Sequence, residues 1–353
     1  MKINSLIKHK LNCRLYQYKL FLLFMVVIMV SFVYFWFAEK IKMANKQREL
    51  IEVIEKEGGT VLYENRYLQR FKEWIDHNYF NTVIGVYIGK ENAKDSIISH
   101  LNDLPNIRYL EIRSNNITES GLEKLKYMTQ LQDLLIFNPN ISISVLKNIK
   151  NPILMKKLIF CGKSKITLEY IKDMTSLRVL LIKGQCVSDE EYKNINKMTC
   201  LIELSLDGNN ISDKGLKYFE CLSNLESLSL SSTNITGKGL IHIKNMNRLR
   251  MLSISATKIN NEDLVYIDGI TNLQFLSLEN TNITDAGLVH LKNLKQLYYL
   301  NIASTNVTDA GLEHLKGLPK LRYLPIKKTK ITKAGMDALQ KKIPSIKYEE
   351  ELD

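Results

Sequence analysis

The sequence lacks the short motifs that mark the common catalytic sites. It has no GxxxxGK[ST] phosphate loop, no GxSxG nucleophile elbow and no HExxH zinc motif. It also has no CxxC pair and no cluster of residues with metal-ligand spacing. Its five cysteines follow no regular framework: Cys13, Cys161, Cys186, Cys200 and Cys221. These absences argue against an enzyme, a metal centre and a disulfide-stabilised scaffold, so we predict no catalytic residue, cofactor or metal ligand.

Acidic residues are absent from residues 1–19, and charges of either sign are absent from residues 20–38. The second stretch, LFLLFMVVIMVSFVYFWFA, has 19 uncharged residues, and a helix needs about 20 to span a bilayer. A cleaved signal peptide would have a shorter apolar region, about 7–15 residues, followed by small residues. Here the run ends in Phe35, Trp36 and Phe37. The stretch therefore favours an uncleaved transmembrane anchor.

Basic residues lie on both sides of the predicted anchor, which makes its orientation a close choice. The tail of residues 1–19 carries five cations and no acid, whereas a long domain translocates largely regardless of its charge. We therefore predict that the tail is cytoplasmic and that the rest of the chain lies outside. Residues 39–59 are predicted to form a juxtamembrane helix or stalk that ends at Gly58 and Gly59. Residues 60–82 are predicted to form an N-terminal cap, with a short strand at 60–63.

Residues 83–345 consist of eleven units of about 24 residues that repeat one apolar pattern. Two consecutive units read LQFLSLENTNITDAGLVHLKNLKQ and LYYLNIASTNVTDAGLEHLKGLPK, with Leu, Ile or Val at positions 1, 4, 6, 11, 16 and 19. The units from Leu131 and Leu154 are counted as one residue short. The predicted unit starts are Val83, Ile107, Leu131, Leu154, Leu177, Leu201, Leu225, Leu249, Leu273, Leu297 and Leu321.

Each unit is predicted to contain a strand at positions 1–8 and a short helix after position 12. Thr or Asn at position 9 would satisfy backbone groups at the turn. Thr or Ser at position 12 would cap the helix, and the acidic residue that often follows suits the helix dipole. Residues 346–353 would form a C-terminal cap strand. Cys161 and Cys186 fall in neighbouring units, where a disulfide is conceivable, but free thiols are favoured.

The pattern LxxLxLxxTxITDxGLxxLxxL resembles a leucine-rich repeat of the helix-bearing kind. That resemblance implies an α/β leucine-rich repeat solenoid, a curved horseshoe with a concave parallel sheet and short convex helices. With its anchor, its GGTVLY segment and its TDAGL repeats, the chain is also similar to bacterial membrane-anchored leucine-rich repeat proteins. This similarity implies partner binding through the concave face. The units from Leu131, Leu154 and Leu177 depart from the pattern because they lack the Gly-Leu pair.

Two groups of outward-facing strand residues are candidate partner-binding sites. The first is unusually apolar for a solvent-facing sheet, and it comprises Leu135, Phe137, Ile159, Val179 and Leu181. The second is rich in residues favoured at interfaces, and it comprises Met251, Phe275, Tyr298, Tyr299, Arg322 and Tyr323. Between them, a polar floor is expected from Ser205, Ser229, Ser253 and Ser277. The aromatic group could also stack on sugar rings.

The sequence therefore favours a non-catalytic, membrane-tethered binding module for a protein or polysaccharide partner. An alternative is a structural or adhesive scaffold of the cell envelope. A remote alternative is a substrate receptor of the ubiquitin-ligase type, which would require an adaptor-binding helical domain before the repeats. Nucleic acid is not expected as a partner, although the net charge is +12, because acidic residues are interspersed with the basic ones.

Overall fold

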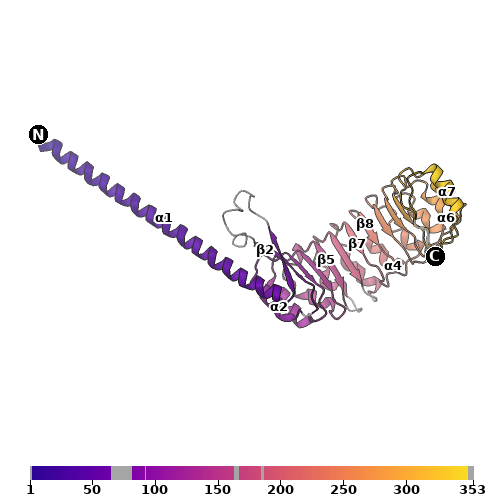
Figure 1. The fold of residues 1–353 in the computed structure, drawn as a ribbon, viewed down its shortest axis with the longest axis horizontal. Helices are drawn as coiled ribbons and strands as arrows, with labels where there is room; N and C mark the ends of the chain where they lie inside the picture. The colour runs from indigo at the N-terminus through magenta and orange to yellow at the C-terminus, as the bar shows by residue number, and fades with distance from the viewer. Residues whose placement is uncertain (1, 65–81, 92, 163–166, 184–186, 349–353) are drawn as a thin grey trace. The chain divides into compact units, whose positions relative to one another are not determined.

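The computed structural model describes residues 2–64, 82–91, 93–162, 167–183 and 187–348 (Figure 1). The chain divides into two units, one comprising residues 1–53 and 63–82, the other residues 54–62 and 83–353. We describe each unit by itself. Residues 65–81, which make up most of the predicted N-terminal cap, lie outside the described residues.

The first unit consists mainly of one long, uninterrupted helix, α1 (Lys2–Lys56), whose residues from 54 onward belong to the second unit. This helix includes the predicted tail, the predicted anchor and most of the predicted juxtamembrane segment. Its large apolar side chains between residues 20 and 37 are 46% to 76% exposed. By length and composition α1 can cross a membrane, a test that a signal sequence near the N-terminus also passes. The helix is followed by Gly58, whose φ of 101° suits the residue after a helix end.

The second unit is built on an 11-stranded sheet whose strand order follows the sequence from β1 to β11. Neighbouring strands from β2 to β11 pair in parallel and in register. The strands are β1 (Gly59–Glu64), β2 (Thr82–Ile88), β3 (Tyr109–Ile112), β4 (Asp133–Phe137), β5 (Lys157–Cys161), β6 (Val179–Lys183), β7 (Glu203–Ser205), β8 (Ser227–Ser229), β9 (Met251–Ser253), β10 (Phe275–Ser277) and β11 (Tyr299–Asn301).

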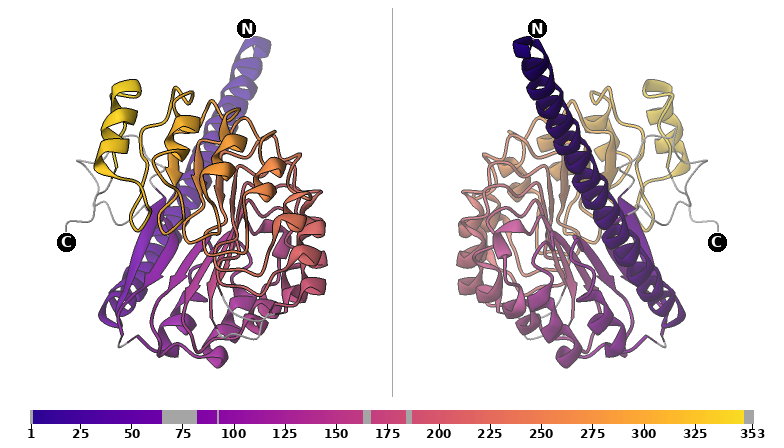
Figure 2. Two further views of the ribbon diagram at one scale, coloured as in Figure 1. Left: turned by 90° about the vertical axis from the view of Figure 1, so that its right-hand side faces the viewer. Right: turned by 90° about the vertical axis from the view of Figure 1, so that its left-hand side faces the viewer.

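Short helices return the chain from one strand to the next and lie on the outer side of the sheet (Figure 2). The α-helices are α2 (Asp95–Leu101), α3 (Glu119–Leu122), α4 (Asp213–Leu216), α5 (Gly237–Leu240), α6 (Asp285–Leu288) and α7 (Lys333–Lys342). The 3₁₀ helices are η3 (Glu123–Tyr127), η4 (Ile143–Asn148), η5 (Pro152–Leu154), η6 (Leu168–Ile171), η7 (Asp189–Ile195), η8 (Lys217–Phe219), η9 (Glu262–Tyr266), η10 (Val289–Leu291) and η11 (Gly311–Leu315). Within their described residues, the units from Leu131, Leu154 and Leu177, which lack the Gly-Leu pair, contain only 3₁₀ helices, and so do the units from Leu249 and Leu297. The architecture is the predicted α/β solenoid.

The repeating apolar positions form one continuous core. In the unit from Leu273, for example, Leu276, Leu278 and Ile283 are fully buried. The predicted start at Leu154 is wrong, however. Met155 is fully buried, and Leu158 pairs in register with Leu134, so the unit starts one residue later, at Met155. Both residues are apolar, but a start at Leu154 would place Lys157 at the buried position 4, whereas a start at Met155 places Leu158 there. The unit from Leu131 therefore has full length, and the following unit is two residues short.

The last repeat pairs with its neighbours through single β-bridges rather than through a full strand. Tyr323 bridges to Tyr299 on one side and to Lys347 on the other. The predicted C-terminal cap strand is therefore represented by Lys347, and residues 349–353 lie outside the described residues.

The turn after each later strand repeats a left-handed backbone and a threonine hydrogen bond. Gly208 has a φ of 70°, and the equivalent position 8 is left-handed in the next five units, at Ser232, Ala256, Asn280, Ser304 and Lys328. At position 9 the threonine hydroxyl donates to the carbonyl three residues earlier, as from Thr281 to Leu278. The predicted role of position 9 is therefore confirmed for these units. In the unit from Ile107, however, Asn115 is exposed and Ser114 is buried in its place.

Tyr192 is an exception to the apolar core, and it provides a stability prediction. Its side chain is fully buried and packs edge-on against Phe219, with ring centroids 5.8 Å apart. Among the described residues its hydroxyl has no hydrogen-bond partner, and burial raises its pKa. Because an unpaired buried hydroxyl is costly, Tyr192→Phe should stabilise the protein by about 1 kcal/mol, seen as a higher thermal midpoint. Tyr218→Phe is the control, since the exposed Tyr218 hydroxyl donates to Glu190. A lower midpoint for Tyr192→Phe would contradict the prediction.

Candidate binding surface

Outward-facing strand residues of successive units form parallel rows along the inner face of the sheet. Position 5 gives one row, formed in order by Tyr87, Glu111, Leu135, Ile159, Leu181, Ser205, Ser229, Ser253, Ser277 and Asn301. Position 3 gives a second row, formed in order by Gly85, Tyr109, Asp133, Lys157, Val179, Glu203, Ser227, Met251, Phe275, Tyr299, Tyr323 and Lys347. Most residues of both predicted sites lie in these two rows, whereas Phe137, at position 7, and Tyr298 and Arg322, at position 2, lie outside them.

The structure brings three members of the predicted apolar site together. Leu135, Ile159 and Leu181 are direct register partners, so their side chains lie at the strand spacing of about 4.8 Å and cover one another. Leu135 is only 6% exposed, and Phe137, Ile159, Val179 and Leu181 are half-buried. The expectation of a fully solvent-facing apolar patch is therefore wrong for Leu135, because its neighbours on both sides shield it.

A polar and aromatic cluster next to this patch was not predicted. The Tyr109 hydroxyl donates to Glu111, and Arg113 Nε lies 2.6 Å from Glu111 Oε1. The Arg113 guanidinium also lies over the Phe137 ring, 4.2 Å from its centroid. Burial and the bond to Glu111 raise the pKa of Tyr109. The signal in the sequence was the alternation Tyr, Glu, Arg at positions 3, 5 and 7 of one unit, which places all three side chains on one face.

The predicted polar floor is a chain of hydrogen bonds between side chains. Asp207 accepts from the Ser229 hydroxyl at 2.6 Å and from the Ser205 hydroxyl at 3.2 Å. Further along, the Ser231 and Ser253 hydroxyls are 2.7 Å apart, as are those of Ser255 and Ser277. Because these hydroxyls bond to one another, the floor is polar and ordered rather than a set of separate free donors.

The predicted aromatic site is assembled at the C-terminal end of the position-3 row. Met251, Phe275 and Tyr299 are register partners, and the Phe275 and Tyr299 rings stack with centroids 4.2 Å apart and an interplanar angle of 8°. Tyr298 and Tyr323 meet at 63° with centroids 5.3 Å apart. Met251 is 46% exposed, Tyr298 48% and Tyr323 36%. We call these five residues the aromatic patch.

Cations border the aromatic patch at its C-terminal end. Lys347 Nζ lies 5.8 Å from the centroid of the Tyr323 ring, within the range of a cation–π contact. Arg322 is half-buried, and its Nη1 donates to the Leu321 carbonyl at 3.0 Å. The hydrogen bond with Tyr323 raises the pKa of Tyr298. The patch therefore combines partly exposed aromatic side chains with positive charge.

A ladder of side-chain bonds on the opposite side of the units holds successive repeats in register. Asp213 Oδ1 accepts from the Thr236 amide and its Oδ2 accepts from the Thr236 hydroxyl, both at 2.7 Å. Thr236 caps the helix of the next unit. Acidic residues were expected to complement the helix dipole of their own unit, but the structure shows that they also bind the following unit. Equivalent links join Asp95 to Thr118, Asp189 to Ser212, Asn261 to Thr284, Asp285 to Thr308 and Asp309 to Thr332.

The same ladder explains the glycine of the Gly-Leu pair. A Cβ added to Gly239 would lie 2.6 Å from Asp213 Oδ1, and one added to Gly311 would lie 2.5 Å from Asp285 Oδ1. The carboxylate therefore occupies the volume that a side chain would need. Between the units from Leu225 and Leu249 the link is missing, because Gly237 stands where the linked units have Asp or Asn. There Asp263 Oδ2 accepts from the Asn260 amide of its own unit at 2.9 Å.

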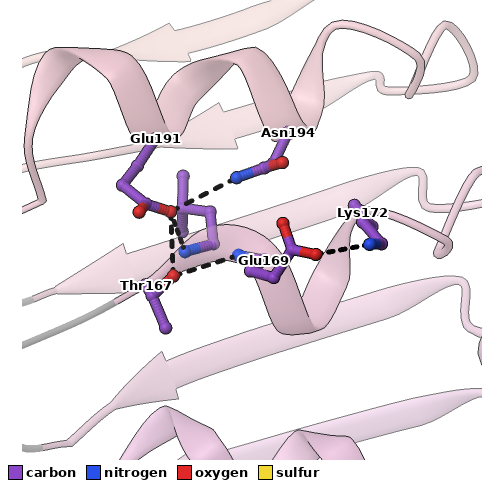
Figure 3. Close-up of polar contacts among 6 residues, drawn as sticks. Thr167, Glu169, Lys172, Glu191 and Asn194 are labelled. Carbon is purple, nitrogen blue, oxygen red and sulfur yellow. Dashed lines mark hydrogen bonds and ion pairs between the residues drawn. The ribbon is translucent and has the colours of Figure 1, made fainter.

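The ladder runs in the reverse direction at one junction (Figure 3). Thr167 caps η6 and is followed by Leu168 rather than an acid. Glu191 of the next unit, which occupies the position of the missing glycine, reaches back and accepts from the Thr167 hydroxyl and the Leu168 amide, both at 2.9 Å. Asn194 donates to the same carboxylate oxygen, Oε2, at 3.2 Å. Here the missing glycine and the missing acid compensate each other.

The cysteines and histidines provide no metal site within the described ranges. No group of three or more His, Cys, Asp or Glu side chains there could hold a metal ion. Cys161 is a half-buried free thiol whose pKa is raised by burial, and Cys200 and Cys221 are exposed. Cys186 lies outside the described residues.

Two family models match the repeat region. One, described as leucine rich repeat, covers residues 196–259, and a second of the same description covers residues 103–126 and 269–292. The chain is a leucine-rich repeat protein. A comparison with the sequences of curated proteins found no match to this leucine-rich repeat protein.

Solved structures show the same fold. An internalin of Listeria monocytogenes, InlF, is 22% identical, with a TM-score of 0.57, and the match covers 72% of this leucine-rich repeat protein and 71% of the internalin. A TDR receptor is 14% identical, with a TM-score of 0.50 and coverage of 75%. The match covers 46% of the receptor chain, less than half its length. At these identities the likeness shows the fold alone.

Proposed function

We propose that this leucine-rich repeat protein is a non-catalytic binding module that holds a protein partner on its concave face, at the aromatic patch. The supporting observation is the partial exposure of Met251, Tyr298 and Tyr323 beside the stacked Phe275 and Tyr299 rings. Tyr, Phe and Met are enriched at the cores of protein interfaces. The apolar site around Leu135 and Ile159 is the weaker candidate, since its side chains shield one another.

The ring geometry favours a protein over a polysaccharide. Aromatic recognition of a sugar relies on an open ring face, against which the sugar ring stacks. The Phe275 and Tyr299 rings are nearly parallel and 4.2 Å apart, so the faces between them cover each other and their edges are left outward. Ring edges suit packing against apolar or aromatic side chains. We therefore place a side chain of a protein partner against this pair.

We further propose that α1 tethers the module to a membrane, with residues 1–19 in the cytoplasm and the repeats outside it. The exposed apolar surface of residues 20–37 supports the tether, because in water it would be unfavourable to leave so much of it uncovered. The excess of cations over acids in residues 1–19 supports the orientation.

The test is capture of the partner by the full chain in intact cells, using a membrane-impermeant crosslinker and mass spectrometry. Phe275→Ala and Tyr299→Ala should each reduce capture about ten-fold or more, as expected for central aromatic contacts. Their thermal midpoints should change little, because both side chains are half-buried.

Ile159→Ala is the matched control from the other candidate site, and it should leave capture unchanged. Loss of capture with Ile159→Ala and not with Phe275→Ala would show that the partner binds the apolar site instead. Capture that occurs only after the cells are lysed would contradict the proposed orientation while leaving the binding site intact.

A further inference from the structure

The outer side of the repeats carries an exposed aliphatic stripe that the concave-face function does not use. Position 17 of three consecutive units is Ile241, directly after α5, Val265, in η9, and Val289, at the start of η10. Their exposed fractions are 40%, 50% and 37%. Three exposed β-branched aliphatic side chains at the same position of consecutive repeats indicate a site that binds another apolar surface.

Charged residues continue this line in both directions, with opposite signs at the two ends. Position 17 is Lys193 and Lys217 in the two units before the stripe, and Glu313 and Asp337 in the two units after it. All four side chains are exposed. We call these seven residues the position-17 column, which reads Lys, Lys, Ile, Val, Val, Glu, Asp along the chain.

We propose that the position-17 column binds a second copy of this chain, antiparallel, about a two-fold axis at Val265. A two-fold interface presents the same surface from both copies. Rotation about an axis across the column places Val265 opposite itself, Ile241 opposite Val289, and Lys217 opposite Glu313. The aliphatic centre then meets an aliphatic centre, and each basic end meets an acidic end. A parallel pairing would instead place like charges opposite one another.

Local contacts of the charged residues leave this pairing possible. Lys217 Nζ lies 4.9 Å from the Tyr218 ring centroid, and Glu313 forms an exposed ion pair with Lys316 three residues later. Such exposed pairs are weak and exchange readily. Beside the axis, Glu262 would face the same residue of the other copy, and Lys238 occupies the equivalent position 14 of the preceding repeat. Lys217 and Glu313 are the charged residues directly next to the stripe. Because a convex surface recedes on both sides of the contact, we expect this pair to lie closer together than Lys193 and Asp337.

Charge reversal of the full chain, purified in detergent micelles, tests the proposal by sedimentation equilibrium. The native chain should form a dissociable dimer. Lys217→Glu alone and Glu313→Lys alone should each raise the dissociation constant about ten-fold, since each places two like-charged pairs in the dimer. The double variant should regain the native dissociation constant. An equimolar mixture of the two single variants should also dimerise tightly, because each mixed dimer contains only opposite-charge pairs.

Lys147→Glu is the matched control. Lys147 also occupies position 17 but lies five repeats from the axis, so its reversal should leave the dissociation constant unchanged. The proposal is overturned by a native chain that stays monomeric at every concentration. It is equally overturned by a dimer that the single reversals do not weaken, or by a double variant no tighter than the singles.

Discussion

Replacing Gly239 by alanine should lower the free energy of unfolding by about 2 kcal/mol, as typically results when an extra methyl group is forced into a packed site. The added Cβ would lie 2.6 Å from Asp213 Oδ1, 2.8 Å from Leu216 Cδ1 and 3.2 Å from the Asp213 Cα. The carboxylate cannot move aside without losing its two bonds to Thr236. The measurement is the thermal or urea midpoint of the full chain.

Two variants show whether the carboxylate is the cause. Gly269→Ala is the control, because a Cβ at Gly269 meets nothing within 4 Å, and its midpoint should stay the same or rise slightly. Asp213→Ala should itself be destabilising, since it leaves the Thr236 amide without its partner. Combined with Gly239→Ala, it should cost less than the sum of the single changes, because the alanine methyl group then has room. Strict additivity would show that the clash lies elsewhere.

Glu191→Ala should cost about 3 kcal/mol, a larger effect than is usual for a polar residue that is not fully buried. The variant removes an acceptor of three hydrogen bonds, from the Thr167 hydroxyl, the Leu168 amide and Asn194. Hydrogen bonds to a charged group contribute about 1.5–3 kcal/mol each, although not additively. The amide at the start of η6 would be left without its acceptor, so the junction between the two units should open first.

The matched control lies at the same junction (Figure 3). Glu169 forms an ion pair with Lys172 within one helix, and both side chains are about half exposed, at 52% and 48%. Glu169→Ala should therefore change stability by less than about 0.5 kcal/mol. If Glu191→Ala and Glu169→Ala have equal effects, Glu191 is an ordinary surface residue and the reversed link carries no special stability.

The architecture could be predicted from the sequence because every repeat has the same pattern of apolar positions. That pattern assigns Leu276, Leu278 and Ile283 to the core, and all three are buried. The start at Met155 was predictable in the same way. Leu154 and Met155 are both apolar, but a start at Leu154 puts Lys157 at the buried position 4, whereas a start at Met155 puts Leu158 there, and the pairing with β4 agrees with the second choice.

The candidate site was predictable as a set of residues but not as a surface. Phe275 and Tyr299 were recognisable as outward-facing aromatics, yet their stacking, which leaves ring edges outward, depends on how both side chains turn. Leu135 faces the same side as its neighbours, yet it is buried by them. The repeated Asp and Gly also have a role that the sequence of one unit cannot reveal. The Asp carboxylate of one repeat packs against the Gly of the next.

The missing link at Gly237 has a mechanical consequence. At most junctions of the later repeats, a load applied along the stack is shared between strand hydrogen bonds and a carboxylate clamp on the outer edge. Between the units from Leu225 and Leu249 the clamp is absent, because the nearby Asp263 closes on its own unit instead. The outer edge is therefore more compliant there, and bending that widens the outer edge concentrates at this junction, next to the exposed Val265.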